Sequence, residues 1–475
     1  MSAELDRGGI AGHPRGLTTL FLTEFWERFS YYGMRAILFL FMVASPETGG
    51  LGLDTERAAW IYGLYTGSVY LATIPGGFIA DKLLGLRRAV LAGGILIALG
   101  HYSLALHGVP TLFFAGLILI VLGTGLLKAN ISSIVGGLYG PDDDRRDSGF
   151  TLFYMGINLG ATVSPLVCGY LGQRVGWHWG FGAAGVGMTL GLVQYVLGGG
   201  RLGSAGLLRE PPRNAGKTWL AVSASVVAIG AALILSGRYR DYLIVGSAAV
   251  LFAWLLLKGA ENAVERRRIA AIALLFVFAS LFWMGFEQAG SSLTLFADRL
   301  TDNRILGGDM PSSLYQSVEP FFVISLAPLF AWMWTRLGRR APSSPAKFAI
   351  ALLLLSASFF VVAFASTLFE QQQVKVSPLW LVGVYFLHAL GELSLSPIGL
   401  SMVSKLAPVR ILGFIMGIWF LSNAVGNFTA GSVAGYFDRL PLPQLFGAVG
   451  LVTLVATVVL ALLAKPIRGL MSGVR

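Results

Sequence analysis

Residues 24–33 read Glu-Phe-Trp-Glu-Arg-Phe-Ser-Tyr-Tyr-Gly, and they lie inside an apolar run that extends from about residue 17 to residue 45. A charge inside a membrane-spanning helix costs roughly 3 kcal/mol or more, so it is retained mainly where it faces a cavity or an opposite charge. Polar residues in and just beyond this stretch recur at spacings of four, three and four: Glu24, Arg28, Tyr31 and Arg35. This spacing predicts a membrane helix with one polar face directed inward, and Glu27 borders that face.

The composition is that of an integral membrane protein. Of the 475 residues, 55% are hydrophobic and 12% are charged, whereas a soluble globular chain carries about 25% charged residues. Because one span needs about 20 apolar residues, the chain supplies a dozen or more helices rather than a single anchor on a soluble enzyme. The only cysteine, Cys168, excludes a disulfide framework and a thiolate metal site, and the five histidines do not cluster.

Charged or Gly/Pro-rich segments divide the apolar sequence into fourteen predicted helices. We expect them near residues 17–45, 55–82, 86–107, 110–138, 147–173, 177–199, 218–236, 241–258, 269–297, 312–337, 346–369, 378–406, 411–437 and 442–465. The predicted organisation is a tail (1–16), a six-helix bundle (17–200), a basic linker (201–217), a two-helix insertion (218–258), a second basic linker (259–268), a second six-helix bundle (269–465) and a tail (466–475). The insertion helices carry no inward polar stripe and are interpreted as a peripheral scaffold.

The distribution of charge predicts the orientation. One side of the predicted membrane receives Lys82, Arg87, Arg88, Arg145, Arg146, the 201–217 linker, Arg266, Arg267, Arg268, Arg336, Arg339, Arg340, Lys347, Lys405 and Arg410. The other side carries few bases and several acids. The positive-inside rule therefore places both termini in the cytoplasm. We expect the protein to reside in a bacterial inner membrane. The same rule also explains the net charge of +11 without a nucleic-acid partner.

Residues 77–88, between the second and third spans, read Gly-Phe-Ile-Ala-Asp-Lys-Leu-Leu-Gly-Leu-Arg-Arg and resemble the cytoplasmic loop motif of the major facilitator superfamily. A shorter echo, residues 336–340, occupies the equivalent loop of the second half. Two six-helix halves are typical of that superfamily, in which the substrate site lies near the midplane between the halves. We therefore expect an all-α membrane protein with the major facilitator fold.

Ionisable residues inside the spans are the strongest candidates for a functional site. There are eight: Glu24, Glu27, Arg28, Arg35, Lys128, Glu287, Glu319 and Glu392. Further pairs one helical turn apart would line a cavity from both halves: Tyr154 with Asn158, Trp283 with Glu287, Glu392 with Ser396, and Trp419 with Asn423. The alternatives are a Glu24–Arg28 pair that serves packing alone, aromatic rings in the core, and an asparagine bound to a neighbouring helix. His388, one turn before Glu392, is interpreted as a packing histidine rather than a partner of that carboxylate. The charged run 142–147 is interpreted as a solvated loop rather than a metal site.

The 24–33 stretch matches the first-helix ExxERFxYYG motif of the proton-coupled oligopeptide transporter family. Residues 150–160 resemble the fifth-helix signature of this family, and residues 391–397 resemble its tenth-helix signature. The resemblance covers the whole chain, and the extra helix pair is typical of bacterial members. Three positions depart from the family pattern: Ala129 replaces a proline, Glu319 replaces an asparagine, and Gly63 stands where animal homologues have a histidine.

The resemblance implies a role for each candidate. Arg28, Arg35 and Lys128 would form a basic pocket, Glu392 and Asn158 would receive the amino end of a peptide, and Glu287 would titrate. Other residues would complete the lining: Tyr31, Tyr32, Tyr70, Tyr154, Trp283, Ser396 and Trp419. Together with the basic pocket, Glu24, Glu27, Glu287 and Glu392 would couple protons to gating. Glu319 is expected to hold a proton beside Glu392, to pair with a pocket base, or to point away.

The expected function is proton-coupled symport of di- and tripeptides by alternating access, by a monomer that uses no cofactor besides the proton gradient. Protonation of Glu287 would release Arg35 and open the outer gate, while peptide binding would perturb Lys128 and Glu392 at the inner side. No ATP-binding motif is present, and an enzyme is disfavoured because no set of nucleophile, base and orienting residue is evident. The alternatives are another small anion or drug-like substrate, and a peptide-sensing receptor or membrane assembly factor that binds without transport.

Overall fold

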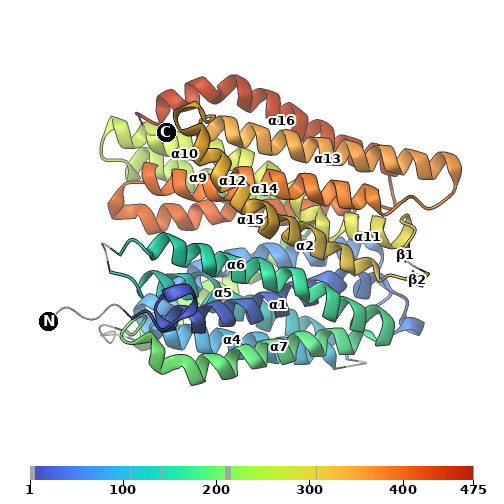
Figure 1. The fold of residues 1–475 in the computed structure, drawn as a ribbon, viewed down its shortest axis with the longest axis horizontal. Helices are drawn as coiled ribbons and strands as arrows, with labels where there is room; N and C mark the ends of the chain where they lie inside the picture. Colours follow the sequence, from blue (N-terminus) through green and yellow to red (C-terminus); the bar gives the residue numbers. More distant parts are fainter. Residues whose placement is uncertain (1–5, 107–108, 141–142, 209–214, 306, 474–475) are drawn as a thin grey trace. The chain divides into compact units, whose positions relative to one another are not determined.

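The computed structural model describes residues 6–106, 109–140, 143–208, 215–305 and 307–473, and it is helical over most of that length (Figure 1). The exceptions to the all-α prediction within the described residues are short. Strands β1 (Arg304–Ile305) and β2 (Gly308–Asp309) form an antiparallel hairpin, and one isolated parallel bridge joins Thr301 to Val376.

Packing divides the chain into two compact units. Unit 1 comprises Met1–Gly52 and Ser68–Ala232, and unit 2 comprises Leu53–Gly67 and Leu233–Arg475. Helix α2 (Thr55–Leu71) is therefore divided at Gly67, and α8 (Ala215–Leu235) at Ala232. The domain boundaries expected from the sequence remain predictions, and residues 209–214 of the 201–217 linker lie outside the described part of the chain.

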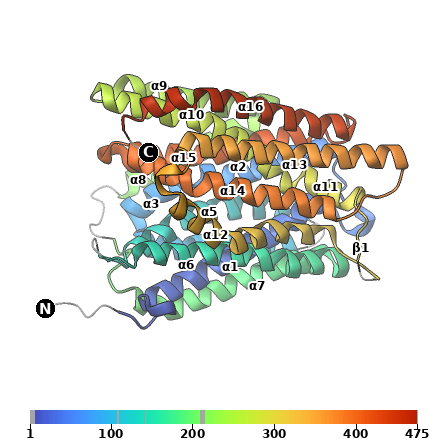
Figure 2. The same cartoon turned by 45° about the horizontal axis from the view of Figure 1, so that its top comes forward.

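Unit 1 is built mainly from α1 (Arg15–Val43), α3 (Thr73–Ile79), α4 (Leu86–Ala105), α5 (Pro110–Gly136), α6 (Arg146–Ser164) and α7 (Trp177–Gly198). Helix α1 packs against α6 and α7, and both ribbon views show these three helices side by side (Figure 1, Figure 2). The seam between α4 and α5 depends on small residues. A Cβ atom added at Gly93 would lie 2.5 Å from the carbonyl oxygen of Gly123, so only glycine permits this approach.

Unit 2 contains most of α2, followed by α9 (Arg240–Trp254), α10 (Ala263–Phe286), α11 (Ser292–Arg299), α12 (Val318–Leu337), α13 (Ser344–Gln372), α14 (Leu379–Leu406), α15 (Leu412–Ala434) and α16 (Leu442–Leu470). Residues that favour the first turn of a helix lie at the starts of several of these helices. Asn262 caps α10 by accepting a 2.9 Å hydrogen bond from the Glu265 backbone N–H, and α13 and α16 begin with a proline in the first turn.

Twelve helical segments among the described residues are long and apolar enough to cross a membrane. The two predicted spans that are absent from this set are 17–45 and 55–82. The first, α1, carries several charges, and the second is divided between α2, which has 17 residues, and the shorter α3. The chain is thus a multi-pass helical membrane protein, whereas the count of fourteen spans and the two-bundle layout remain predictions.

Arg87, from the motif at residues 77–88, binds the start of the linker that follows α7. Its Nε donates to the Ala205 carbonyl at 2.6 Å, and its backbone N–H donates to the Gly206 carbonyl at 3.1 Å. The motif therefore anchors the start of α4 to the segment that follows α7.

Candidate substrate and proton site

Three ionisable side chains of α1 form one buried ionic group. Arg28 Nε lies 3.1 Å from Glu24 Oε1 and forms a second, close ion pair with Glu27. All three side chains are almost completely buried. Removing charges from water is costly, so close pairing is needed to retain them in the interior. The helical spacing predicted that Glu24 and Arg28 share a face, and this is confirmed. Glu27, expected at the border of that face, joins the same group.

The ionic group carries more carboxylates than bases, and Lys128 on α5 supplies the missing positive charge. Lys128 lies within electrostatic reach of Glu24. The formal charges of Arg28, Lys128, Glu24 and Glu27 sum to zero. A change in the charge of any one member therefore leaves an uncompensated charge in the interior, which the protein can relieve by taking up or releasing a proton.

Each of the three predicted pocket bases lies over a tyrosine ring. The distances to the ring centroid are 5.3 Å for Arg28 Cζ over Tyr31, 5.9 Å for Arg35 Cζ over Tyr32, and 3.8 Å for Lys128 Nζ over Tyr70. The negative face of an aromatic ring attracts a cation, and more strongly where water is excluded. The tyrosines predicted as lining residues are thus partners of the bases, and they keep the charged groups in defined positions.

Helix α6 approaches this region through a glycine. A Cβ atom added at Gly160 would lie 2.5 Å from the Phe25 carbonyl oxygen and 3.0 Å from the Arg28 Cβ. The side chain of Asn158, one turn away from Tyr154, is buried and donates a 3.1 Å hydrogen bond to the Tyr154 carbonyl. Tyr154 itself is exposed. The amide of Asn158 therefore bonds its own helix, and the expected contact with a peptide remains a prediction.

In unit 2, Glu287 lies where α10 stops. The helix ends at Phe286, a short 3-10 turn covers Glu287–Gly290, and α11 begins at Ser292. Glu287 is buried at this break, one turn after the half-buried Trp283. Gly426 of α15 permits close packing here, because any side chain at this position would clash with Trp283. The break therefore places a buried carboxylate on a non-α-helical turn within the single span Ala263–Arg299.

The remaining candidates lie on α12, α14 and α15. Glu319 in the first turn of α12, Glu392 on α14 and Ser396 one turn later are all half-buried. Trp419 on α15 is buried beside Phe348, with ring centroids 6.1 Å apart. The Ser396 hydroxyl oxygen has no hydrogen-bond partner among the described residues.

His388 is enclosed by aromatic rings. It stacks on Phe286 with ring centroids 5.5 Å apart, and Phe359 and Tyr385 lie at 5.9 and 6.1 Å. Within the part of the chain that the structure describes, neither ring nitrogen has a hydrogen-bond partner. This environment favours the interpretation of His388 as a packing residue rather than a partner of Glu392.

Comparison with known proteins assigns the family. Residues 87–450 match the model of the POT family. The chain belongs to the POT family. A peptide transporter, YePEPT, of Yersinia enterocolitica is 42% identical over 97% of this chain and 96% of its own length. A di-/tripeptide transporter of Lactococcus lactis is 38% identical over 98% of both chains. A crystal structure of a peptide transporter POT in complex with sulfate superposes with a TM-score of 0.91, at 43% identity over 99% of this chain and 98% of that one.

These POT relatives extend over the first helix, which precedes the part matched by the family model. The predicted family is thus confirmed. The structure divides the predicted site residues between its two units. Unit 1 contains Glu24, Glu27, Arg28, Tyr31, Tyr32, Arg35, Tyr70, Lys128, Tyr154 and Asn158. Unit 2 contains Trp283, Glu287, Glu319, Glu392, Ser396 and Trp419. A single binding site that combines both sets remains a prediction.

Sequence reasoning missed a buried base in this POT family member. Arg240, the first residue of α9, is 1% exposed and donates to the carbonyls of Trp60 at 2.9 Å and Phe428 at 3.1 Å. It also pairs with Asp241, whose carboxylate accepts a hydrogen bond from Ser432. The adjacent base and acid at the start of an apolar span were the sequence signal that could have indicated this buried pair. The insertion helix α9 is therefore anchored to α2 and α15, and it is more than a peripheral scaffold.

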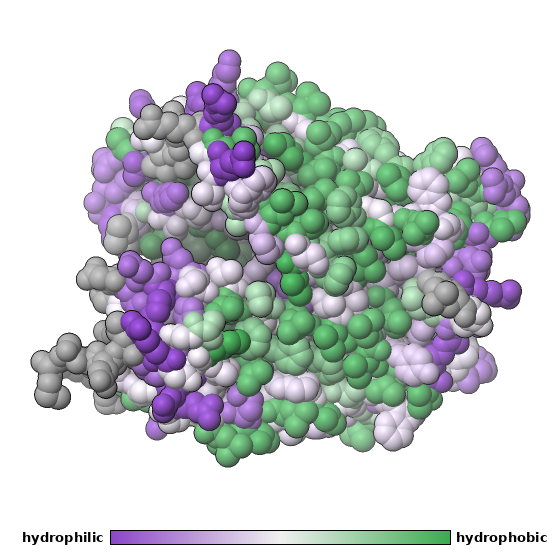
Figure 3. Space-filling view, in the orientation of Figure 1, coloured by the Kyte–Doolittle hydropathy of each residue, from purple (hydrophilic) through white to green (hydrophobic). Residues whose placement is uncertain are grey.

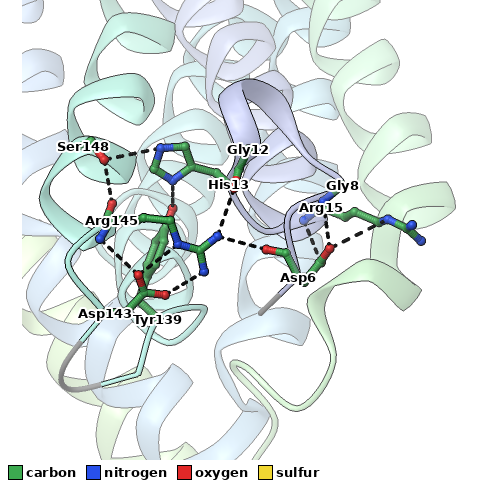
Figure 4. Close-up of polar contacts among 9 residues, drawn as sticks. All are labelled: Asp6, Gly8, Gly12, His13, Arg15, Tyr139, Asp143, Arg145 and Ser148. Carbon is green, nitrogen blue, oxygen red and sulfur yellow. Dashed lines mark hydrogen bonds and ion pairs between the residues drawn. The ribbon is translucent and has the colours of Figure 1, made fainter. Parts of the chain in front are cut away.

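A second missed feature joins residues 6–15 to the α5–α6 connection (Figure 4). Arg145 donates to the carbonyls of Asp6 at 3.1 Å and Gly12 at 2.9 Å, and it binds the Asp143 carboxylate through two nitrogens. Asp6 accepts from the backbone N–H of Arg15, the first residue of α1, at 2.9 Å. His13 Nδ1 lies 2.9 Å from the Tyr139 hydroxyl. We call this network the N-terminal clasp. It holds residues that the sequence placed in a solvated tail, and residues 1–5 of that tail lie outside the described part.

Proposed function

We propose that the chain is a proton-coupled symporter that imports di- and tripeptides by alternating access. It is a peptide transporter by family and by its relatives, and the observation that carries the proposal is the set of buried and half-buried bases in unit 1. Arg28, Arg35 and Lys128 are the three residues that the family resemblance assigns to a peptide carboxylate, and each is held on a tyrosine ring. A pocket built this way would recognise the charged ends of a peptide without reading its side chains.

The carboxylates would bind the amino end of the peptide and the transported proton. Glu392, with Asn158, would receive the peptide ammonium group, and Glu319 stands where the family has an asparagine. Glu287 would take up the transported proton, because it is a buried carboxylate at a break in a helix, where a change of charge can alter local geometry. The balanced group around Arg28 would then respond to the substrate, since a peptide carboxylate near Lys128 would upset its zero net charge.

We further propose that α1 and the α2–α3 segment cross the bilayer along with the twelve candidate spans, which gives fourteen. Charges in α1 face protein rather than lipid, so they do not prevent insertion. With this count, the basic loops and both termini lie in the cytoplasm. We propose in addition that the protein resides in the inner membrane and acts as a monomer.

The decisive experiment is uptake of a radiolabelled dipeptide into proteoliposomes with an alkaline interior. We expect accumulation above the external concentration, loss of this accumulation when a protonophore is added, and competition by other di- and tripeptides. Binding without accumulation would instead indicate a peptide-sensing receptor. Competition by nitrate or free amino acids, with none by dipeptides, would indicate a different substrate on the same scaffold.

A further inference from the structure

The end of α12 and the start of α13, both in unit 2, carry two pairs of a base and a tryptophan. Arg336 Cζ lies 5.3 Å from the centroid of the Trp332 ring, and Lys347 Nζ lies 4.2 Å from the centroid of the Trp334 ring. Cations and indole rings attract one another. Tryptophan is also the residue that membrane proteins concentrate at the boundary between hydrocarbon and headgroups. The two pairs therefore mark the level of the membrane surface on this part of the molecule.

Among the described residues, no carboxylate pairs with either of these bases. Arg336 and Lys347, together with Arg340 and Lys405, form what we call the α12–α13 basic cluster, and none of them makes an ion pair within the described residues. Lys405, in the last turn of α14, lies within electrostatic reach of Lys347. Arg410 provides the contrast, because Glu261 and Glu265 both bind it. An uncompensated group of like charges at a membrane surface attracts an external anion.

The helix face below the cluster is apolar and uncovered. Four side chains of α12 are largely exposed: Phe321, Leu329, Trp332 and Leu337. In Figure 3 hydrophobic residues cover the region that α12 crosses in Figure 1, and hydrophilic residues gather near the end of this helix. Among the spans of unit 2 that follow α9, the apolar window of α12 is the least buried. A ligand for this surface must therefore combine an anionic head with an apolar body.

We infer that the end of α12 and the start of α13 form a binding site for an anionic phospholipid of the cytoplasmic leaflet. Arg336 and Lys347 would bind the headgroup phosphate, since guanidinium and ammonium groups both donate to phosphate oxygens. Trp332 would lie at the glycerol level, with the acyl chains along the exposed face of α12. The assignment to the cytoplasmic leaflet uses the proposed orientation of the chain, whereas the chemistry of the site does not depend on transport.

The test is a titration of the purified full-length protein with dioleoyl phosphatidylglycerol or dioleoyl phosphatidylcholine, followed by native mass spectrometry. We expect phosphatidylglycerol to bind more tightly than phosphatidylcholine. Replacing Arg336 and Lys347 with glutamine should lower the affinity for phosphatidylglycerol by about fivefold for each cation removed. Lys465→Gln removes an exposed base of α16 that has no aromatic partner among the described residues, and it should leave the affinity unchanged.

Trp332→Leu provides a second variant, because it keeps the apolar face and removes only the ring beside Arg336. This variant should weaken phosphatidylglycerol binding. It therefore tests the inference independently of the double variant. Wild-type affinity in a monodisperse double variant, or equal affinity for the two lipids, would overturn the inference. Displacement of phosphatidylglycerol by inorganic phosphate would also overturn it, because the site would then recognise free phosphate rather than a lipid.

Discussion

Arg28 illustrates how single residues set the electrostatics of this protein. Its guanidinium pairs with two carboxylates of the same helix, so the group needs a further positive charge to be neutral. Lys128, on a different helix, supplies that charge while it packs over the Tyr70 ring. Because all of these groups are buried or half-buried, water screens the imbalance poorly when one charge is lost.

Lys128→Ala should therefore reduce peptide uptake in proteoliposomes roughly tenfold or more, because alanine can neither balance Glu24 nor attract a peptide carboxylate. The protein should remain monodisperse in detergent, since Lys128 is only half-buried. Tyr70→Phe is the matched control, because it keeps the aromatic face under the ammonium group and should retain most of the uptake. Uptake at the wild-type rate in Lys128→Ala would remove this residue from the mechanism.

Glu319→Asn, which restores the family residue, should shift the pH optimum of peptide uptake. A carboxylate gains or loses a proton with pH, whereas an asparagine amide both donates and accepts at every pH. If Glu319 shares the amino-end pocket with Glu392, two nearby carboxylates disfavour double ionisation, so a proton is held there. The measurement is uptake and binding affinity as a function of pH. Identical profiles in the variant and the wild type would show that Glu319 neither titrates nor contacts the peptide.

Helix α9 shows how an element can be held by one polar anchor. Most of its surface is exposed, but Arg240 at its start binds backbone carbonyls of α2 and α15 and lies over the rings of Trp60 and Phe428. These carbonyls, together with Asp241, leave few of the guanidinium donors unsatisfied. The anchor therefore fixes α9 against α2 and α15 within unit 2.

Removing this anchor should destabilise the protein. Arg240→Ala would leave Asp241 without its charge partner and two carbonyls without their donor, at a cost of about 3 kcal/mol. This corresponds to a fall in Tm of about 3 °C in a chain of this size. Thermal unfolding in detergent provides the measurement, with Tyr242→Ala as the control, because Tyr242 is an exposed residue of the same helix. An unchanged Tm for Arg240→Ala would show that the network contributes nothing to stability.

The two carboxylates of the N-terminal clasp, Asp6 and Asp143, should stay ionised across the physiological pH range. Hydrogen bonds from Arg145 lower the pKa of Asp143, and backbone hydrogen bonds from Arg15 and Gly8 lower the pKa of Asp6. A lowered pKa in the folded state means that the stabilisation is present above the ordinary value of 3.8 and is lost as the pH falls through the folded-state value. The burial of Tyr139 raises its pKa to about 12, so the tyrosine stays neutral as well.

The backbone N–H groups of Gly8 and Arg15 donate to Asp6, so their amide hydrogen exchange, corrected for intrinsic rates, should show constant protection between about pH 5 and 8. Asp143→Asn should lower this protection, because it removes the charged partner of Arg145. Asp144→Asn, at the exposed neighbouring position, should not. Protection that changes within this pH range in the wild-type protein would contradict the assignment.

For the whole molecule, the central question is how proton movement is coupled to peptide movement. Glu287→Gln should abolish accumulation of peptide under a pH gradient and leave peptide counterflow intact, since exchange needs no net proton movement. The glutamine retains the shape of the side chain at the break after α10 and removes its titration. Full concentrative uptake would exclude Glu287 as the coupling site. Loss of both activities together would indicate a structural role.

The site was predictable where it depends on local spacing or on the family motif. Glu24 and Arg28 are one turn apart on one helix, so their pairing follows from helical geometry alone. The tyrosines opposite the bases were named as lining residues but not as their partners. Lys128 lies close to Tyr70 only because α5 packs beside the segment that contains Tyr70, and no periodicity within one helix contains that information.

Sequence by itself determined that this chain is a multi-pass helical membrane protein of the POT family, because hydropathy, helical period and motif spacing are properties of short stretches. Tertiary structure alone decided the rest. It buried Arg240 against Trp60 and Phe428, which lie at least 180 residues away along the chain. It joined residues 6–15 to Arg145, and it left the α12–α13 basic cluster without carboxylate partners among the described residues. These features depend on which distant segments share a surface, and that is decided by the packing of whole helices.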